Sequence, residues 1–214
     1  LTIQAAAGVM SVTGDEEGAP AKCGVPVSDF ASGLYAAFSI AAALVRVRSG
    51  GQGAHIDIPM FGCTLGIAAL QTSEYFGSGR DPRRLGSAHP RNSPYQAYQA
   101  EDGYFAIAAG NHKLWLQVLK VMDLPLLAED ARFLTPSLRA ANQGELKVIL
   151  EEHFVKRPVD HWIESFNGAG VPHARINGYA AALEDPQTQH MQWVQPLELP
   201  NGHKTRTFAS PVRL

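Results

Sequence analysis

The chain has 214 residues, 45% of them hydrophobic, with a formal net charge of −2 at pH 7. This composition is typical of one or two globular domains with a substantial core. The near-neutral balance argues against nucleic acid as a partner, because a phosphate backbone selects for a basic surface. The two cysteines and eight histidines show no metal-ligand spacing, so we expect no metal site.

Two cysteines are too few for a disulfide framework, so we expect a protein of the reducing cytoplasm. The sequence begins Leu1-Thr2-Ile3-Gln4, with no basic region ahead of an apolar stretch, so no signal peptide is predicted. The apolar stretch Phe30–Val45 is shorter than the roughly 20 residues of a spanning helix. It also contains Ser32, Gly33 and Ser39. We therefore predict a buried core helix here and no membrane association.

In the first half of the chain, apolar helices alternate with irregular segments. The pattern predicts a short helix over 1–13, an exposed loop at 15–24, and a long helix from 29 to 48 that is apolar on all sides and therefore buried. Glycines at 50–53 end this helix. The rest of this half is predicted as a strand at 54–58, a second apolar helix at 60–75 and a long irregular segment at 77–94.

The second half predicts a smaller α+β unit. Glu101-Asp102-Gly103 lies between two alternating segments, which indicates a β-hairpin over 95–109. Gly110-Asn111 then opens a helix, and Asn142 with Glu145 predicts a capping box before another. The remaining predicted elements are a helix beginning at Pro158, a strand at 171–176, a short helix near Asp185, and two strands at 193–199 and 204–208.

Asp29 is a lone carboxylate at the start of the long apolar helix. On the residues alone, Asp29 or Ser28 is interpreted as an N-cap, a role worth about 1 kcal/mol. The chain offers little other chemistry, since it has no Walker-A loop, no GxGxxG and no GxSxG elbow.

The sequence around Asp29 resembles the family III CoA-transferases, the group that contains formyl-CoA transferase. The matching motifs are Gly24-Val25-Pro26 followed by Asp29, a helix of small residues, Arg48-Ser49-Gly50-Gly51-Gln52-Gly53, and Ile56-Asp57-Ile58. Further landmarks along the chain are Gln4 to Gly8, His89-Pro90, Pro94-Tyr95-Gln96, Asp102-Gly103-Tyr104, Gly110-Asn111, Gly168 to Pro172 and Asp185-Pro186-Gln187. The resemblance extends over essentially the whole chain.

The resemblance implies transfer of coenzyme A from an acyl-CoA donor to a carboxylic acid, with Asp29 as the catalytic nucleophile. Asp29 attacks the thioester to form an aspartyl anhydride, and the released CoA thiolate then forms an aspartyl-CoA thioester. A carboxylate is ionised at neutral pH, so no histidine base is needed. The acyl-CoA is a substrate, and no bound cofactor is expected.

The resemblance also implies an α/β fold in which an N-terminal Rossmann-like segment precedes the region matched here. We therefore expect this chain to be a fragment, inactive alone, of an enzyme that forms an interlocked homodimer. The expected parts are 1–85, the remainder of the large domain; 86–183, a small α+β domain; and 184–214, a β-rich linker returning to the large domain.

Four further residues are expected to bind substrate: His89, Arg91, Asn92 and Asn111. The segment 86–93 takes the position of a glycine-rich lid in formyl-CoA transferase, although it holds one glycine where that loop has several. The hairpin and the Gly110-Asn111 turn resemble dicarboxylate-handling members of the family. For a dicarboxylate, Arg83, Arg84 and Arg91 are the candidate cationic partners.

Two alternatives remain open. A CoA-ester racemase or epimerase of the same superfamily uses the matching aspartate as an acid or base, and those we compare carry a glutamate where this chain has Asn111. The chain is also interpretable as a non-catalytic assembly module that packs on a partner chain.

Overall fold

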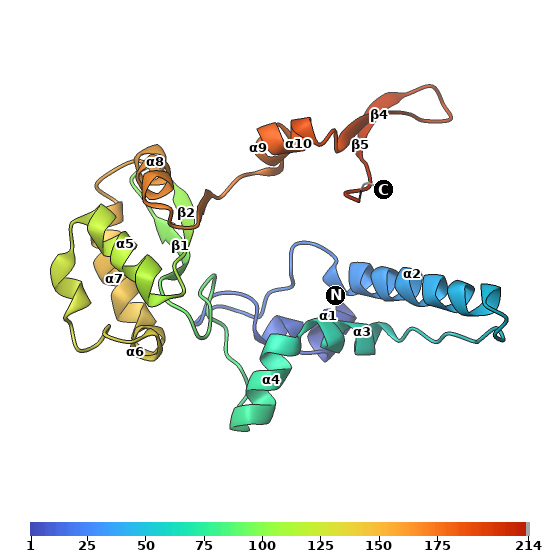
Figure 1. Ribbon diagram of the computed structural model, residues 1–214, viewed down its shortest axis with the longest axis horizontal. Coiled ribbons are helices and arrows are strands. Elements are labelled where there is room, and N and C mark those ends of the chain that lie inside the picture. The colour runs from blue at the N-terminus through green and yellow to red at the C-terminus, as the bar shows by residue number, and fades with distance from the viewer. Residues whose placement is uncertain (213–214) are drawn as a thin grey trace. The chain divides into compact units, whose positions relative to one another are not determined.

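The computed structural model describes residues 1–212. Contacts within the chain divide it into two compact units, 1–91 and 92–214 (Figure 1). The predicted division at 85/86 and 183/184 stays a prediction.

The first unit consists of helices joined by irregular chain. The predicted helix over 1–13 is split at Gly8, whose φ of 81° places it in the left-handed region that glycine adopts most readily. The predicted helix over 60–75 is likewise split, at Ala68. The helices are α1 (Thr2–Ala6), the 3₁₀ turn η1 (Val9–Ser11), α2 (Val27–Arg48), α3 (Met60–Ile67) and α4 (Ala69–Ser78).

Helix α2 forms where it was predicted, but the prediction that it is buried is wrong for this chain. Only Ser28 and Ala31 are buried along its length, whereas the side chains of Phe30 and Phe38 are 65% and 74% exposed. Figure 1 shows α2 extending away from the other helices of its unit. A helix that is apolar on all sides needs neighbours on all sides. Within residues 1–212, α3 is the helix that packs along it.

By length and composition α2 is also apolar enough to cross a membrane, with 6% of its most apolar window buried. A single helix of this kind is weak evidence of a membrane span, because core helices of soluble proteins and signal sequences meet the same criteria of length and composition.

The strand predicted at 54–58 does not form, and this segment has no regular secondary structure. A strand gains its stability from ladder hydrogen bonds and cross-strand side-chain pairs. The alternating pattern is present, but no strand among residues 1–212 pairs with it.

The irregular segment that follows α4 is anchored to the acidic loop at 15–18. The Gly86 N–H donates to the Gly14 carbonyl at 3.0 Å. The Arg84 guanidinium donates to the carbonyls of Asp15 and Gly18 at 3.1 and 2.9 Å. Arg83 forms a 2.6 Å ion pair with Glu16. Two of the three arginines considered for a dicarboxylate are thus engaged within the fold.

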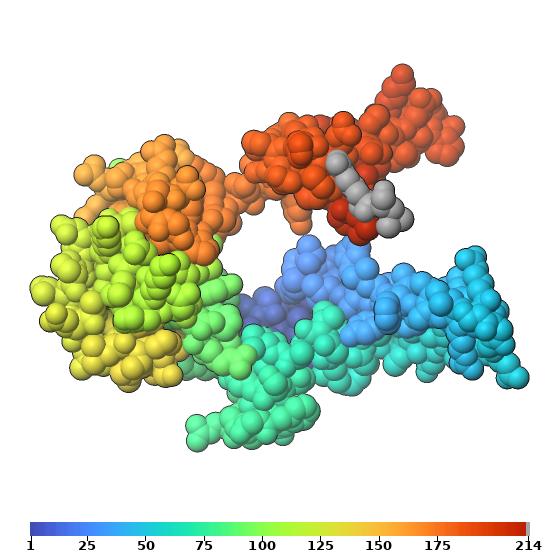
Figure 2. Space-filling model, in the orientation of Figure 1, coloured from blue at the N-terminus to red at the C-terminus, as the bar shows by residue number. Residues whose placement is uncertain are grey.

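The second unit contains an antiparallel sheet in the order β1-β2-β3, which confirms the predicted hairpin and the predicted strand after it. Its strands are β1 (Tyr95–Gln99), β2 (Tyr104–Ala108) and β3 (His173–Arg175). The helices are α5 (His112–Met122), the 3₁₀ turn η2 (Pro125–Ala128), α6 (Pro136–Ala141), α7 (Gln143–Phe154) and α8 (Val159–Ala169). In Figure 2 the side chains of α5 to α8 fill one rounded body.

The core of this unit lies between the sheet and its helices. Phe154 is at its centre, with its ring centroid 5.0 Å from those of Phe105 and Trp162. The Trp162 indole N–H donates to the Phe154 carbonyl at 2.9 Å, so this aromatic side chain is buried with its polar atom satisfied. Leu146 and Leu150 add the apolar face of α7.

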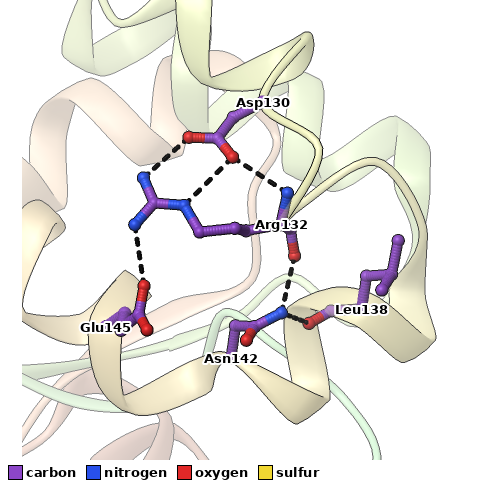
Figure 3. Close-up of polar contacts among 5 residues, drawn as sticks. All are labelled: Asp130, Arg132, Leu138, Asn142 and Glu145. Atoms are coloured by element: carbon purple, nitrogen blue, oxygen red, sulfur yellow. Dashed lines mark hydrogen bonds and ion pairs between the residues drawn. The ribbon is translucent and has the colours of Figure 1, made fainter.

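The predicted capping box at the start of α7 is wrong. The Asn142 side chain accepts no cap hydrogen bond; its amide nitrogen donates to the carbonyls of Arg132 and Leu138 at 3.0 and 2.9 Å (Figure 3). Glu145 pairs with Arg132 at 2.7 Å, and Arg132 also pairs with Asp130. The short helix α6 was not predicted from the sequence. It is capped by Thr135 at its N-terminus, and Asn142 lies at its C-terminus.

The last elements are α9 (Tyr179–Leu183), α10 (Pro186–His190) and the antiparallel strands β4 (Val194–Glu198) and β5 (Lys204–Phe208). Both strands and the helix near Asp185 were predicted. The Asp185 carboxylate caps α10 by accepting from the Gln187 N–H at 2.8 Å.

Candidate functional site

Asp29 lies in the first turn of α2 with its side chain exposed. The N-cap interpretation is wrong, because Pro26 occupies the cap position and no side chain caps this helix. The Asp29 backbone N–H donates to the Pro26 carbonyl at 3.1 Å. Within residues 1–212 no hydrogen bond or ion pair engages its carboxylate, so the group is available to react. A helix N-terminus stabilises such an anion by roughly 0.3–1 kcal/mol.

The residue before it, Ser28, points the other way. Its side chain is buried, and its hydroxyl has no hydrogen-bond partner among residues 1–212. The Ser32 hydroxyl, one turn further along, donates to the Ser28 carbonyl at 2.8 Å. The start of α2 therefore has a buried polar face and an exposed carboxylate.

An apolar cavity of about 430 Å³ lies in the same unit, and Val27, two residues before Asp29, is part of its wall. Its walls come from segments far apart in the sequence, which is why no single motif indicated it. Thr13, Gln71 and Asp81 add polar groups to its lining. Most of the wall is hydrocarbon, from Val9, Val12, Leu65, Ile67, Tyr75 and Phe76. Such a lining suits an apolar group better than a charged one.

His89 and Arg91, both predicted substrate ligands, also belong to the first unit. The His89 ring is partly buried, and its Nδ1 accepts a hydrogen bond from the Arg91 backbone N–H at 3.1 Å. In a neutral imidazole this places the ring proton on Nε2. The Arg91 guanidinium is exposed and has no carboxylate partner among residues 1–212, unlike that of Arg83. The lid role of segment 86–93 stays a prediction.

Asn92 and Asn111, the other two predicted ligands, belong to the second unit and meet at Gly110. A Cβ built on Gly110 would stand 3.3 Å from the Asn92 amide carbon. Asn111 is the N-cap of α5, and its Oδ1 accepts from the Leu114 N–H at 2.9 Å. Capping uses the amide oxygen and leaves the amide nitrogen as a donor. We call residues 92, 110 and 111 the asparagine corner.

Arg139 is a buried residue beside this corner that the sequence analysis missed. Its side chain is 0% exposed. Its Nε donates to the Ser93 carbonyl at 3.0 Å and its Nη1 to the Phe133 carbonyl at 2.9 Å. Its guanidinium lies 5.3 Å from the ring centroid of Trp115. In the sequence, Arg139 is simply an arginine in a short apolar segment. An arginine on the protein surface would look the same, so the sequence does not indicate that Arg139 is buried.

Burial lowers the pKa of Arg139 from its ordinary value. The group nevertheless stays charged, because the ordinary value is high enough that arginine keeps its proton in proteins. Three buried polar atoms of this region have no hydrogen-bond partner among residues 1–212: Ser93 Oγ, Trp115 Nε1 and Arg139 Nη2.

No group of three or more His, Cys, Asp or Glu side chains in the part of the chain that the structure describes could hold a metal ion.

Comparison with known proteins identifies the family. Residues 1–214 match the family described as CoA-transferase family III. The chain therefore belongs to the family III CoA-transferases. It is 34% identical over 209 residues to succinyl-CoA:glutarate CoA-transferase of Homo sapiens, covering 98% of this chain and 48% of that protein. It is 36% identical over 187 residues to acetyl-CoA:oxalate CoA-transferase of Acetobacter aceti, covering 87% of this chain and 48% of that protein.

Solved structures show the same fold. A CAIB/BAIF family protein from Brucella suis superimposes with a TM-score of 0.79 at 36% identity, covering 99% of this chain and 55% of the other. Rv3272 from Mycobacterium tuberculosis, at 22% identity, has a TM-score of 0.84 over 100% of this chain and 56% of the other. The predicted α/β fold class is confirmed, and the chain spans about half the length of the relatives that it matches.

Proposed function

We propose that the whole protein transfers coenzyme A between an acyl-CoA and a carboxylic acid, with Asp29 as the catalytic nucleophile. The observation that carries the proposal is the exposed Asp29 carboxylate, unpaired within residues 1–212, in the first turn of an apolar helix. The proposal is supported by the membership of this chain in the family III CoA-transferases.

The proposed reaction has two exchanges and begins at the thioester carbonyl. The Asp29 carboxylate attacks this carbon, the C–S bond breaks, and an aspartyl–acyl anhydride and CoA thiolate result. The thiolate attacks the aspartyl carbonyl, which releases the donor acid as a carboxylate and leaves an aspartyl-CoA thioester. The acceptor carboxylate repeats these steps in reverse, so Asp29 is regenerated. No proton must be moved, which suits a site whose nucleophile is an anion.

The helix N-terminus supplies too little energy to explain catalysis, since a rate enhancement of 10⁶-fold requires about 8 kcal/mol. The larger contributions must come from positioning and from donors preorganised toward the tetrahedral oxyanion. We assign substrate binding to His89, Arg91, Asn92 and Asn111. The two asparagine amides would donate to the acceptor carboxylate.

We further propose that the acceptor is a dicarboxylate. Relatives of this chain are named for succinyl-CoA with glutarate, and for oxalate. A second carboxylate needs a cation, and guanidinium is well suited to bind it in a bidentate manner. Arg83 and Arg84 are already engaged, whereas Arg91 is exposed and has no carboxylate partner among residues 1–212. Arg91 is therefore our candidate.

The test is covalent trapping. The whole protein is incubated with succinyl-CoA and hydroxylamine, and the position of the resulting hydroxamate is read by mass spectrometry. We expect modification at Asp29 and no CoA transfer in Asp29→Ala. The matched control is Glu17→Gln, an exposed carboxylate of the same unit, which should retain full transfer. Modification at another residue, or full transfer by Asp29→Ala, would contradict the proposal. Exchange of an α-proton with solvent in place of CoA transfer would indicate a racemase.

We also propose that the active form is an interlocked homodimer in the cytoplasm and that residues 1–214 alone are inactive. Light scattering on the whole protein tests the first statement, and fractionation of the native cells tests the second. Turnover by the isolated 214-residue chain would contradict the third.

A further inference from the structure

Arg139 carries a charge in a place where burial makes charge costly. Its side chain is 0% exposed, and no carboxylate among residues 1–212 forms an ion pair with it. Its hydrogen bonds go to two neutral carbonyls, those of Ser93 and Phe133. An uncompensated buried cation destabilises a fold, and an apolar side chain of similar volume is often the more stable choice.

The two carbonyls belong to segments separated in the sequence by forty residues or more, at Ser93 before β1 and at Phe133 before α6. A guanidinium presents several donors in a fixed planar fork, so it sets the distance and the orientation between two acceptors at once. The ring of Trp115, from α5, lies against the same guanidinium at 5.3 Å and limits its movement. Three segments are thereby held around one side chain.

Two of these three contacts, those with Ser93 and Trp115, connect Arg139 to the asparagine corner. Ser93 directly follows Asn92, and the Pro94 carbonyl accepts from the Ala109 N–H at 2.9 Å, which joins the two sides of the corner. On the opposite side, the backbone N–H of Trp115 donates to the Asn111 carbonyl at 3.0 Å. Arg139 therefore contacts the chain on both sides of the corner without reaching its surface.

We propose that Arg139 is a positioning residue that fixes Asn92 and Asn111 in the orientation that binds the acceptor carboxylate. This inference rests on the proposed function, which assigns those two side chains to the acceptor. Arg139 touches neither substrate nor Asp29 in this role; it acts through the Ser93 carbonyl and the Trp115 ring.

The unpartnered donors support a positional role over a purely stabilising one. Covalent geometry puts Nη2 on the same edge of the guanidinium as Nε, which donates to Ser93. That edge therefore faces Ser93, yet Nη2 and the Ser93 hydroxyl have no partner among residues 1–212. A side chain retained for stability alone would be expected to satisfy these atoms, since a buried polar atom without a hydrogen-bond partner destabilises the fold.

The experiment measures steady-state transfer from succinyl-CoA to glutarate by the whole protein and by Arg139→Met and Arg139→Lys. We expect Arg139→Met to raise the KM for glutarate about ten-fold while the KM for succinyl-CoA stays within about two-fold, because small misplacements of binding groups cost up to about 10²-fold. Arg139→Lys keeps the charge but cannot span both carbonyls in a planar fork, so it should show a smaller rise of the same kind.

The control for destabilisation is Leu150→Ala, a core substitution on α7. It should lower the melting temperature and leave the ratio of the two KM values unchanged. If Arg139→Met does not fold, Arg139→Lys and Trp115→Phe provide the same comparison. An unchanged KM ratio in the folded variants overturns this inference. Absence of CoA transfer by the wild-type protein overturns the proposed function instead, so the two failures are distinguishable.

Discussion

The amide of Asn92 packs directly on Gly110, with its carbon 3.3 Å from the position that a Gly110 Cβ would take. This contact brings Asn92 next to the helix cap Asn111, nineteen positions further along the chain, and depends on position 110 having no side chain.

Gly110→Ala should therefore displace the Asn92 side chain. The added methyl requires Asn92 to give by a few tenths of an ångström. We expect a several-fold higher KM for the acceptor acid and a slightly lower melting temperature. The matched control is Gly144→Ala in α7, where a Cβ meets nothing within 4 Å. That substitution should stabilise the protein by up to about 1 kcal/mol, because alanine is the better helix former.

Leu150→Ala should destabilise the second unit strongly. Leu150 is fully buried among the aromatic side chains around Phe154. Loss of this side chain removes apolar burial and leaves a cavity, which together cost about 2–5 kcal/mol. Urea denaturation measures the change. Val148→Ala, on the exposed face of the same helix, should cost much less; equal effects would mean that the core assignment is wrong.

Tyr98 should make folding sensitive to alkali. Burial raises the pKa of its phenol above the ordinary value, and the neutral form is thereby favoured in the folded protein. A raised folded pKa gives stability that is fully present below the unfolded pKa of about 10 and is lost as the pH rises above it. Unfolding free energies measured from about pH 8 to 11 should fall for the wild type and less for Tyr98→Phe. The exposed-site variant Tyr104→Phe should behave like the wild type.

The Asp130–Arg132 pair predicts the opposite pH dependence. Hydrogen bonds from Arg132 lower the pKa of the Asp130 carboxyl. A depressed folded pKa gives stability that is present above the unfolded pKa of about 4 and is lost as the pH falls through the folded value. Asp130→Asn should thus lower the melting temperature at pH 7 and make little difference at about pH 2. Because the pair is exposed, the change should be small. A similar drop in Glu129→Gln would show a non-specific charge effect.

Local signals in the second unit were sufficient to predict most of its elements. The hairpin over 95–109, the helix opened by Gly110-Asn111 and the helix beginning at Pro158 each depend on residues close in sequence, and each formed as predicted. The capping box predicted at Asn142 did not form. Its residues are of the right type, but Arg132, ten residues upstream, engages both Asn142 and Glu145.

The first unit shows where sequence patterns are insufficient. The alternating residues at 54–58 can form a strand only where another strand pairs with them, and the apolar helix α2 is buried only where other elements cover it. The local sequence pattern does not show whether such partners are present. Asp29 could be singled out from its motif, and its assignment as nucleophile remains a prediction. Arg139 could not, because the two carbonyls that it binds are backbone groups and leave no trace in the sequence.

The hydrogen bonds from Arg84 to the loop at 15–18 affect which substitutions that loop can tolerate. The guanidinium binds carbonyl oxygens, which every amino acid supplies, at Asp15 and Gly18. The shape of the loop is therefore independent of most of its side chains. Exchange of Glu16 would remove its ion pair with Arg83, but Arg84 would keep its contacts with the main chain, so the loop can diverge in charge without losing the Arg84 anchor.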